Sequence, residues 1–274
     1  MKHAARNRSW KKRISRSGVY LATACVLLEL LLRVIGLHHA VLYEEDPAVG
    51  YRLKPSQQIH SPCMDVQINQ WGVRDPRPLD NKVDGTPRII ILGDSVTWGG
   101  VRMQQADLFT TLLENAFPGM EVINAGVNGY SVGQMVALYT AHLKGLKPDG
   151  ILVFTIPRDY ERPPVSRLNG SSVAFPLHPP FSAVAVAVAT STRIIRTRLG
   201  WDWLAPAPFT LTDHGISPGP DQIEPNIALL AALAPAQHNS PSLRVVLFPQ
   251  REALPDLEKQ VADGLDRSGV PWLD

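Results

Sequence analysis

The stretch "RIIILGDSVTWGG" (residues 88–100) decides the fold of this chain. Its first five residues have the composition of a strand that is buried on both faces. Gly93-Asp94-Ser95 follows directly, and a Thr-Trp-Gly-Gly turn comes next. A serine at the point where such a strand ends is either a nucleophile presented at the edge of a sheet or the cap of the helix that follows.

The alternation of strand and helix continues along the chain from this stretch. Strands are predicted at 88–92, 120–126, 150–156, 243–249 and 269–274, and helices near 104–116, 131–144, 223–235 and 252–268. Apolar strands separated by helices predict an α/β fold with a parallel sheet of about five strands, covered on both faces.

Polar residues follow three of the predicted strands. Ser95, the loop Asn124–Gly129 and the pair Arg158-Asp159 each come directly after a strand. Ligands of parallel sheets gather beyond the carboxyl ends of the strands. We therefore expect these three segments to converge on one rim of the sheet.

Two further segments flank or interrupt the predicted α/β domain of residues 88–274. Residues 43–87 are rich in turn formers and short β-like pieces, so they are predicted to form a small β-rich lead-in. Residues 160–220 hold many prolines and the Ala/Val-rich run of residues 181–204, and we interpret them as an insertion. The Ala/Val run fits either a helix or a strand.

The N-terminus has the pattern of a membrane anchor. Residues 18–37 are apolar over 20 residues, which is about the length of a helix that spans a bilayer, and Glu29 and Arg33 lie four residues apart on one side of it. Residues 1–17 hold seven Lys and Arg and no acidic residue. This tail predicts a cytoplasmic N-terminus and a main domain outside the cytoplasm, periplasmic or extracellular.

Three other interpretations of residues 18–37 remain open: a cleaved signal peptide, a lipoprotein site at Cys25, and a buried amphipathic helix. The basic tail also explains the overall charge of +2, because residues 38–274 carry 19 Lys and Arg against 24 Asp and Glu. We therefore predict no nucleic-acid partner. Two cysteines give neither a predicted intrachain disulfide nor a thiol metal cluster.

The rim residues resemble those of the SGNH (GDSL-type) hydrolases. The resemblance implies a flavodoxin-like three-layer αβα fold, with Ser95 as the nucleophile and its backbone N–H in the oxyanion hole. The second family motif is similar to "INAGVNGYS" (123–131), where Gly129 is the matching oxyanion donor and Asn124 a supporting residue. A turn that needs glycine for its positive φ angle is the alternative reading of Gly129.

The third and fourth family motifs depart from the pattern. In "VFTIPRDY" (153–160), Ile156 stands for the family's glycine and Arg158 for its oxyanion asparagine, while Asp159 is retained. The Asp-x-x-His that supplies the base is not found up to Asp274, and Asp213-His214 precedes the last two predicted strands. We expect either a base supplied beyond residue 274 or a member that has lost it.

Together these features predict a membrane-anchored serine hydrolase of acyl esters, including O-acetyl groups on glycans. Ser95 is the expected nucleophile, Ser95, Gly129 and Arg158 the expected oxyanion donors, and Asp94, Asn124 and Asp159 supporting residues. No cofactor or metal is expected, and the sequence sets no oligomeric state. The alternatives are an acyltransferase that uses the same serine and a glycan-binding protein without turnover.

Overall fold

The structure is a computed structural model. It describes residues 2–61, 64–101, 103–164, 167–168, 175–199, 211–212, 219–234, 241–249 and 254–273, and the side chains of 2–16 and of most residues in 193–199 are not among those described. The chain divides into two units. The anchor unit comprises Met1–Ala40, Ser61–Cys63 and Pro179–Pro206, and the main unit comprises the rest.

A five-stranded parallel sheet forms the centre of the main unit. Its order is β11-β10-β7-β5-β6. The strands are β5 (Arg88–Gly93), β6 (Glu121–Gly126), β7 (Gly150–Thr155), β10 (Ser242–Leu247) and β11 (Trp272–Leu273). Numbered along the chain within this sheet, the order is 2-1-3-4-5, which is that of flavodoxin-like folds. The predicted fold class is confirmed.

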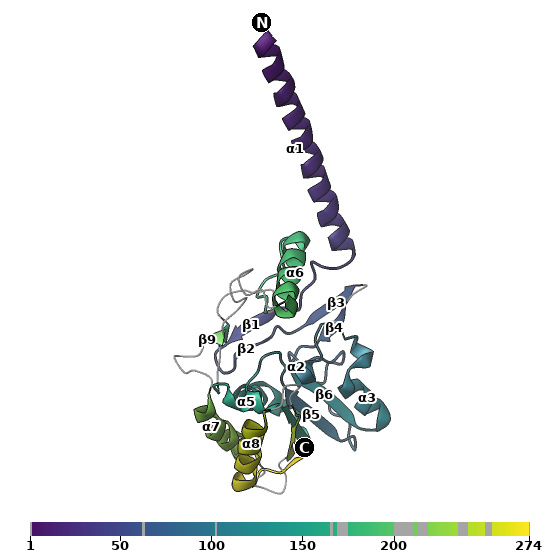
Figure 1. Cartoon of the computed structure of the whole chain (residues 1–274). Helices are drawn as coiled ribbons and strands as arrows, with labels where there is room; N and C mark the ends of the chain where they lie inside the picture. The colour runs from purple at the N-terminus through teal and green to yellow at the C-terminus, as the bar shows by residue number, and fades with distance from the viewer. Residues whose placement is uncertain are drawn as a thin grey trace. The chain divides into compact units, whose positions relative to one another are not determined.

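Helices cover both faces of this sheet. On one face α4 (Val132–Leu138), α7 (Ile223–Leu233) and α8 (Pro255–Ser268) pack on alternate apolar strand residues such as Ile90, Val153 and Val245. On the other face α3 (Phe109–Ala116) packs against β6, and the ring centroids of Phe109 and Phe154 are 5.2 Å apart. In Figure 1, α3 and the α7–α8 pair lie on opposite sides of β5 and β6.

The helices differ from the prediction chiefly at their first turns. The predicted helix of 104–116 is a 3₁₀ turn at Gln105–Asp107 followed by α3, because Leu108 is buried in an extended conformation between them. Residues 132–146 run from α4 through a π-helical turn, Tyr139–Leu143, into a 3₁₀ turn, Lys144–Leu146. A proline in its first turn and a left-handed glycine after its last residue bound α8, as at many helix ends.

The β-rich lead-in lies in the main unit and contributes to its core. Strands β1 (Tyr43–Asp46) and β2 (Gly50–Leu53) form an antiparallel hairpin, and β3 (Gln57–Ser61) pairs with β4 (Met64–Ile68). Tyr51 of β2 is fully buried against Tyr130, with ring centroids 5.3 Å apart. The lead-in is therefore packed beside the loop that follows β6.

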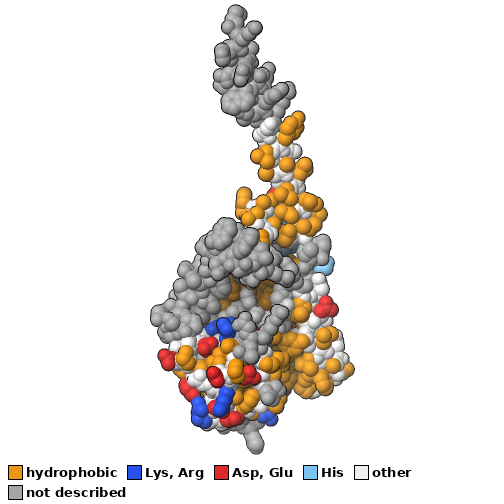
Figure 2. All heavy atoms as spheres, in the orientation of Figure 1, with side chains coloured by type: hydrophobic (Ala, Val, Ile, Leu, Met, Phe, Trp, Pro, Cys, Tyr) orange, Lys and Arg blue, Asp and Glu red, His pale blue; other side chains and the backbone are white. Residues whose placement is uncertain are grey.

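Two helices make up the described part of the anchor unit. Helix α1 runs over Lys2–Val34, and its segment Ser17–Val34 is long and apolar enough to cross a membrane, although a signal sequence has the same properties. Helix α6 runs over Ala183–Leu199, so the Ala/Val run is a helix where it is described. Figure 2 shows hydrophobic side chains along the described part of α1.

Candidate active site

Ser95 lies at the carboxyl end of β5, where the strand turns directly into a helix. Asp94 caps the one-turn helix α2 (Ser95–Trp98), because its Oδ1 accepts a hydrogen bond of 2.8 Å from the Val96 N–H. The Ser95 hydroxyl donates to Asp94 Oδ2 over 3.2 Å. Asp94 is buried and Ser95 is exposed. The hydroxyl is therefore held by a buried carboxylate and still faces solvent.

Two paired glycines let α2 lie directly on the sheet. Gly93 of β5 is the register partner of Gly126 of β6. A Cβ atom on Gly93 would clash with the side chain of Thr97, and one on Gly126 would clash with the backbone at Thr97 and Trp98. These two positions must lack side chains for the Ser95 turn to sit where it does.

This close approach predicts a large effect of a small substitution. Gly126→Ala is expected to lower the free energy of unfolding by about 2 kcal/mol or more, because the added methyl group meets backbone that cannot move aside. Urea titration of the detergent-solubilised protein measures this change. Gly219→Ala is the matched control, since nothing lies within 4 Å of its added Cβ; equal stability of the two variants would contradict the assignment.

Asn124 braces the same turn from below. Its Nδ2 donates to the Thr97 carbonyl over 2.8 Å, and its Oδ1 accepts from the Gly126 N–H over 3.0 Å. The side chain is 1 % exposed. Asn124 is thus placed to support the Ser95 turn, and it does not reach the solvent-facing rim.

Gly129 lies in the loop after β6 with φ +78°, a conformation that side-chain-bearing residues rarely adopt. A Cβ at this position would lie 3.0 Å from Tyr51 Oη and 3.3 Å from Phe175 Cζ. Tyr51 fixes the loop, because its hydroxyl donates to the Asn128 carbonyl over 2.9 Å. Burial raises the pKa of Tyr51 well above its usual value, so the phenol remains a donor.

The backbone N–H groups of Ser95 and Gly129 are two of the predicted oxyanion donors. Ser95 is the first residue of α2, and N–H groups of a first helical turn have no acceptor within the helix. Within the described ranges, no hydrogen bond engages the Gly129 N–H. Both amides are therefore available to a developing negative charge, which preorganised donors of this kind stabilise.

Asp159 and Arg162 tie the third loop to the second. Asp159 is fully buried at the start of α5 (Pro157–Glu161), and its Oδ2 accepts from the Ile156 N–H over 3.0 Å. The Arg162 guanidinium donates to Asp159 Oδ1 over 2.6 Å and to the Tyr130 carbonyl over 2.7 Å. Arg158, the predicted oxyanion donor, lies in α5 and is exposed. Arg162 thus connects this segment to the Gly129 loop.

The charge state of Asp159 gives the site a pH dependence. Burial raises the pKa of Asp159 well above its usual value, the negative charge of Asp94 raises it further, and Arg162 and the Ile156 N–H act in the opposite direction. The folded protein therefore binds the Asp159 proton more tightly than the unfolded chain does, in which the carboxyl ionises near its ordinary pKa of about 4. The contribution of this group to stability is fully present below the unfolded pKa and is lost as the pH rises toward the raised folded value.

Asp159→Asn is therefore expected to remove one component of the pH dependence of stability. Stability of the wild type should fall from about pH 4 upward through this group, and stability of the variant should fall less steeply. Urea titrations at a series of pH values measure the two slopes. Identical slopes for wild type and variant would show that Asp159 is ionised at an ordinary pKa.

Several supporting residues were not found by sequence reasoning. Arg162 stands in a proline-rich segment with no motif to mark it. Asn226 is a buried polar residue of α7 that donates to the Tyr160 and Arg162 carbonyls, both over 2.8 Å, and accepts from the Gly133 N–H over 2.9 Å. A lone asparagine in the apolar sequence of α7 was a usable signal for this role.

Two of the described histidines lie near carboxylates and not near Ser95. His142 Nε2 lies 2.8 Å from Asp46 Oδ2, and His60 Nδ1 lies 3.4 Å from Asp65 Oδ1. Among the residues that the structure describes, no histidine is hydrogen-bonded to Ser95. Asp213-His214 lies outside the described residues. In the searched part of the chain, no group of three or more His, Cys, Asp and Glu residues could hold a metal ion.

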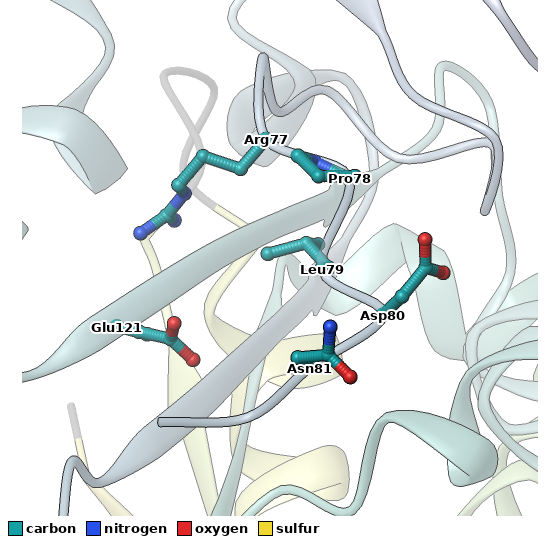
Figure 3. Close-up of a pocket in the computed structure, with 6 residues that line it drawn as sticks. All are labelled: Arg77, Pro78, Leu79, Asp80, Asn81 and Glu121. Atoms are coloured by element: carbon teal, nitrogen blue, oxygen red, sulfur yellow. The ribbon is translucent and has the colours of Figure 1, made fainter.

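A pocket of about 230 Å³ lies at the opposite end of the sheet (Figure 3). It is placed where β5 and β6 begin, and its lining residues are Arg77, Pro78, Leu79, Asp80, Asn81 and Glu121. Its charges are engaged in structural pairs: Glu121 with Arg88 at 2.6 Å, and Arg77 with Asp75 at 2.7 Å. These charged side chains of the lining are therefore part of the structural ion pairs of the sheet.

Comparisons with known proteins give structural neighbours only. No protein-family model matches the chain, and no curated protein matches it. Similar solved structures include a G-D-S-L family lipolytic protein from Desulfitobacterium hafniense, at 12 % identity over 68 % of this chain and 76 % of that one, with a TM-score of 0.38. An α/β hydrolase from the Lake Arreo metagenome is 18 % identical over 69 % and 76 % of the two chains, with a TM-score of 0.37.

A third similar structure is a variant of an acetyl xylan esterase from Geobacillus stearothermophilus. It is 13 % identical over 69 % of this chain and 76 % of that one, with a TM-score of 0.35. The function considered next therefore rests on the residues of this chain.

Proposed function

We propose that the chain is a serine ester hydrolase with Ser95 as its nucleophile. The observation that supports this most strongly is the exposed Ser95 hydroxyl, which donates to buried Asp94 at the carboxyl end of β5, on the rim where the Gly129 loop follows β6. A helix cap alone does not account for it, because Asp94 already caps α2. The direct test is turnover of an aryl acetate by the wild type and by Ser95→Ala.

The chemistry follows from this placement. Ser95 Oγ attacks the acyl carbon of the ester while its proton passes to a general base. The carbonyl oxygen becomes an oxyanion that the Ser95 and Gly129 N–H groups stabilise. The base returns the proton to the leaving oxygen, so that the C–O bond breaks, the alcohol departs and an acyl-serine remains. Water then gives a proton to the base and attacks the acyl carbon, and return of that proton to Ser95 Oγ releases the acid.

The general base in this proposal is a histidine from outside the described residues. A serine hydroxyl is a poor nucleophile near pH 7 without such a base, and the Asp94 carboxylate only holds the hydroxyl in place. His214→Gln tests whether the insertion supplies the base. Loss of turnover in this variant would assign it there, and unchanged turnover would direct the same test to His238, which also lies outside the described residues.

The proposal includes the membrane anchor. The apolar segment Ser17–Val34 of α1 follows a tail of seven Lys and Arg residues, which favours a cytoplasmic N-terminus. An export-dependent alkaline phosphatase fused after residue 40 is expected to be active in a bacterial host. An inactive phosphatase fusion, together with an active cytoplasmic reporter fused at the same residue, would contradict the orientation.

The proposed substrates are acyl esters, with O-acetyl groups on surface glycans as the specific candidate. Transfer of the acyl group to a glycan hydroxyl is the alternative, because it uses the same acyl-serine with a sugar in place of water. Acetate release measured with and without an added glycan acceptor separates the two: hydrolysis releases acetate in both cases, and transfer places acetyl groups on the acceptor.

A further inference from the structure

The Glu29–Arg33 pair of α1 forms hydrogen bonds with the first turn of α6 and the residues directly before it. The Glu29 carboxylate accepts hydrogen bonds from Ser182 Oγ at 2.8 Å, the Ala183 N–H at 2.9 Å and the Val184 N–H at 3.0 Å. It therefore serves as the N-cap of a helix that begins more than 150 residues later. Arg33 donates to Glu29 over 2.7 Å and to the Phe181 carbonyl over 2.5 Å.

This contact accounts for two charged residues in an apolar span. An isolated carboxylate or guanidinium in a bilayer costs several kcal/mol, and the cost falls when each is paired and hydrogen-bonded. Here Glu29 receives donors from Arg33 and from the first turn of α6, and Arg33 reaches the backbone at Phe181. The two charges thus satisfy each other and the free amides of α6 at once.

The depth of this contact places the beginning of α6 in the membrane. Glu29 lies five residues before Val34, the last residue of the apolar segment of α1, and a helix rises 1.5 Å per residue. The first turn of α6 therefore lies about 7 Å inside the end of the span, at the boundary between headgroups and acyl chains.

The side chains of α6 suit that environment. Phe181, directly before the helix, is 95 % exposed, and Val188 is 62 % exposed. Residues 183–190 are Ala, Val and Thr only, whereas Arg193, Arg196 and Arg198 follow in the sequence. The apolar part of α6 runs over Ala183–Thr192, which is shorter than the roughly 20 residues that a spanning helix needs. A short apolar segment next to basic residues can bury its apolar side chains at the edge of a bilayer while the basic residues meet anionic headgroups.

We propose that α6 is a second membrane-binding element, which lies in the outer interface of the bilayer and is fixed there by Glu29. The proposal rests on the proposed span of α1. The occupant of the exposed apolar surface around Phe181 and Val188 is then lipid, since that surface is continuous with the lipid-facing surface of α1 through the Glu29 contact.

Fluorescence quenching in liposomes tests this with the full chain. Single cysteines carry an environment-sensitive fluorophore at three positions: Val188→Cys, the native Cys25 within the span, and Val83→Cys in the main unit, which is 60 % exposed. The other native cysteines are replaced by alanine in each case. Quenching by lipids with a nitroxide near the headgroup is expected to be about twofold or more stronger at position 188 than at position 83.

Glu29→Ala and Glu29→Gln separate the capping of α6 by Glu29 from the insertion of α1 in the bilayer. Alanine is expected to lower the quenching at position 188 while leaving that at Cys25 unchanged, and glutamine, which keeps one acceptor oxygen, is expected to lower it less. Quenching at Cys25 together with water-like behaviour at 188 would overturn the assignment of α6 and leave the anchor intact. Water-like behaviour at both positions would overturn the anchor and the α6 proposal together.

Discussion

Ser95→Ala is expected to lower ester turnover by about 10³-fold or more, because it removes the attacking oxygen while the oxyanion amides remain. Folding should change little, since the Ser95 side chain is exposed and its described hydrogen bond is to the neighbouring Asp94. The measurement is the kcat/KM for an aryl acetate with the full chain in detergent or liposomes, followed by release of acetate from an acetylated glycan.

Ser242→Ala is the matched control for this experiment. Ser242 is an exposed serine at the amino end of β10, on the other end of the sheet from Ser95. It should retain wild-type turnover. Equal rates for the wild type and Ser95→Ala would exclude catalysis by Ser95 and would favour a glycan-binding role without turnover.

Arg74→Met is expected to lower both stability and turnover, although Arg74 is buried. Arg74 is 1 % exposed, and its guanidinium donates to the carbonyls of Trp98, Gly100 and Met103 at 2.6 to 2.8 Å. It also lies 4.7 Å from the centroid of the Trp98 ring. These contacts fix the segment that directly follows α2. The variant leaves three carbonyls without a donor, which should cost about 3 kcal/mol.

The effect on turnover separates positioning from general destabilisation. A shift of the Ser95 turn should reduce kcat about tenfold at a temperature where the variant is still folded. Arg74→Lys should not restore it, since one ammonium group cannot reach three carbonyls in the geometry of a guanidinium fork. Arg244→Met, at an exposed position of β10, is the control and should match the wild type. A folded Arg74→Met variant with the wild-type kcat would show that the segment after α2 keeps its position without Arg74.

Most of the fold could be predicted from the sequence, because each strand, helix or turn is indicated by residues within one short window. The strand at residues 88–92, the helix near 223–235 and the lead-in of short strands all depend on periodicity and turn residues within one window. The Ala/Val run was ambiguous because its side chains suit both a strand and a helix. Its capping carboxylate, Glu29, lies far away in the sequence, so no local pattern identified it.

Only those residues of the candidate site that stand in short sequence motifs could be predicted. Ser95, Asp94, Asn124 and Gly129 stand in short motifs, and the structure places them at or beneath one rim; their catalytic roles remain predictions. Arg74 and Arg162 support that rim from the lead-in and from a proline-rich loop. Their roles depend on contacts across 20 or more residues, which composition and spacing do not reveal.

Labelling with a fluorophosphonate is the most direct test of the central claim, because this reagent reacts with activated serines and not with helix caps. The full chain in liposomes is treated with the reagent, digested, and the modified peptide is identified by mass spectrometry. One adduct is expected, on Ser95, and it should be absent from Ser95→Ala. An adduct on another serine, or none on folded protein, would contradict the assignment of Ser95 as the nucleophile.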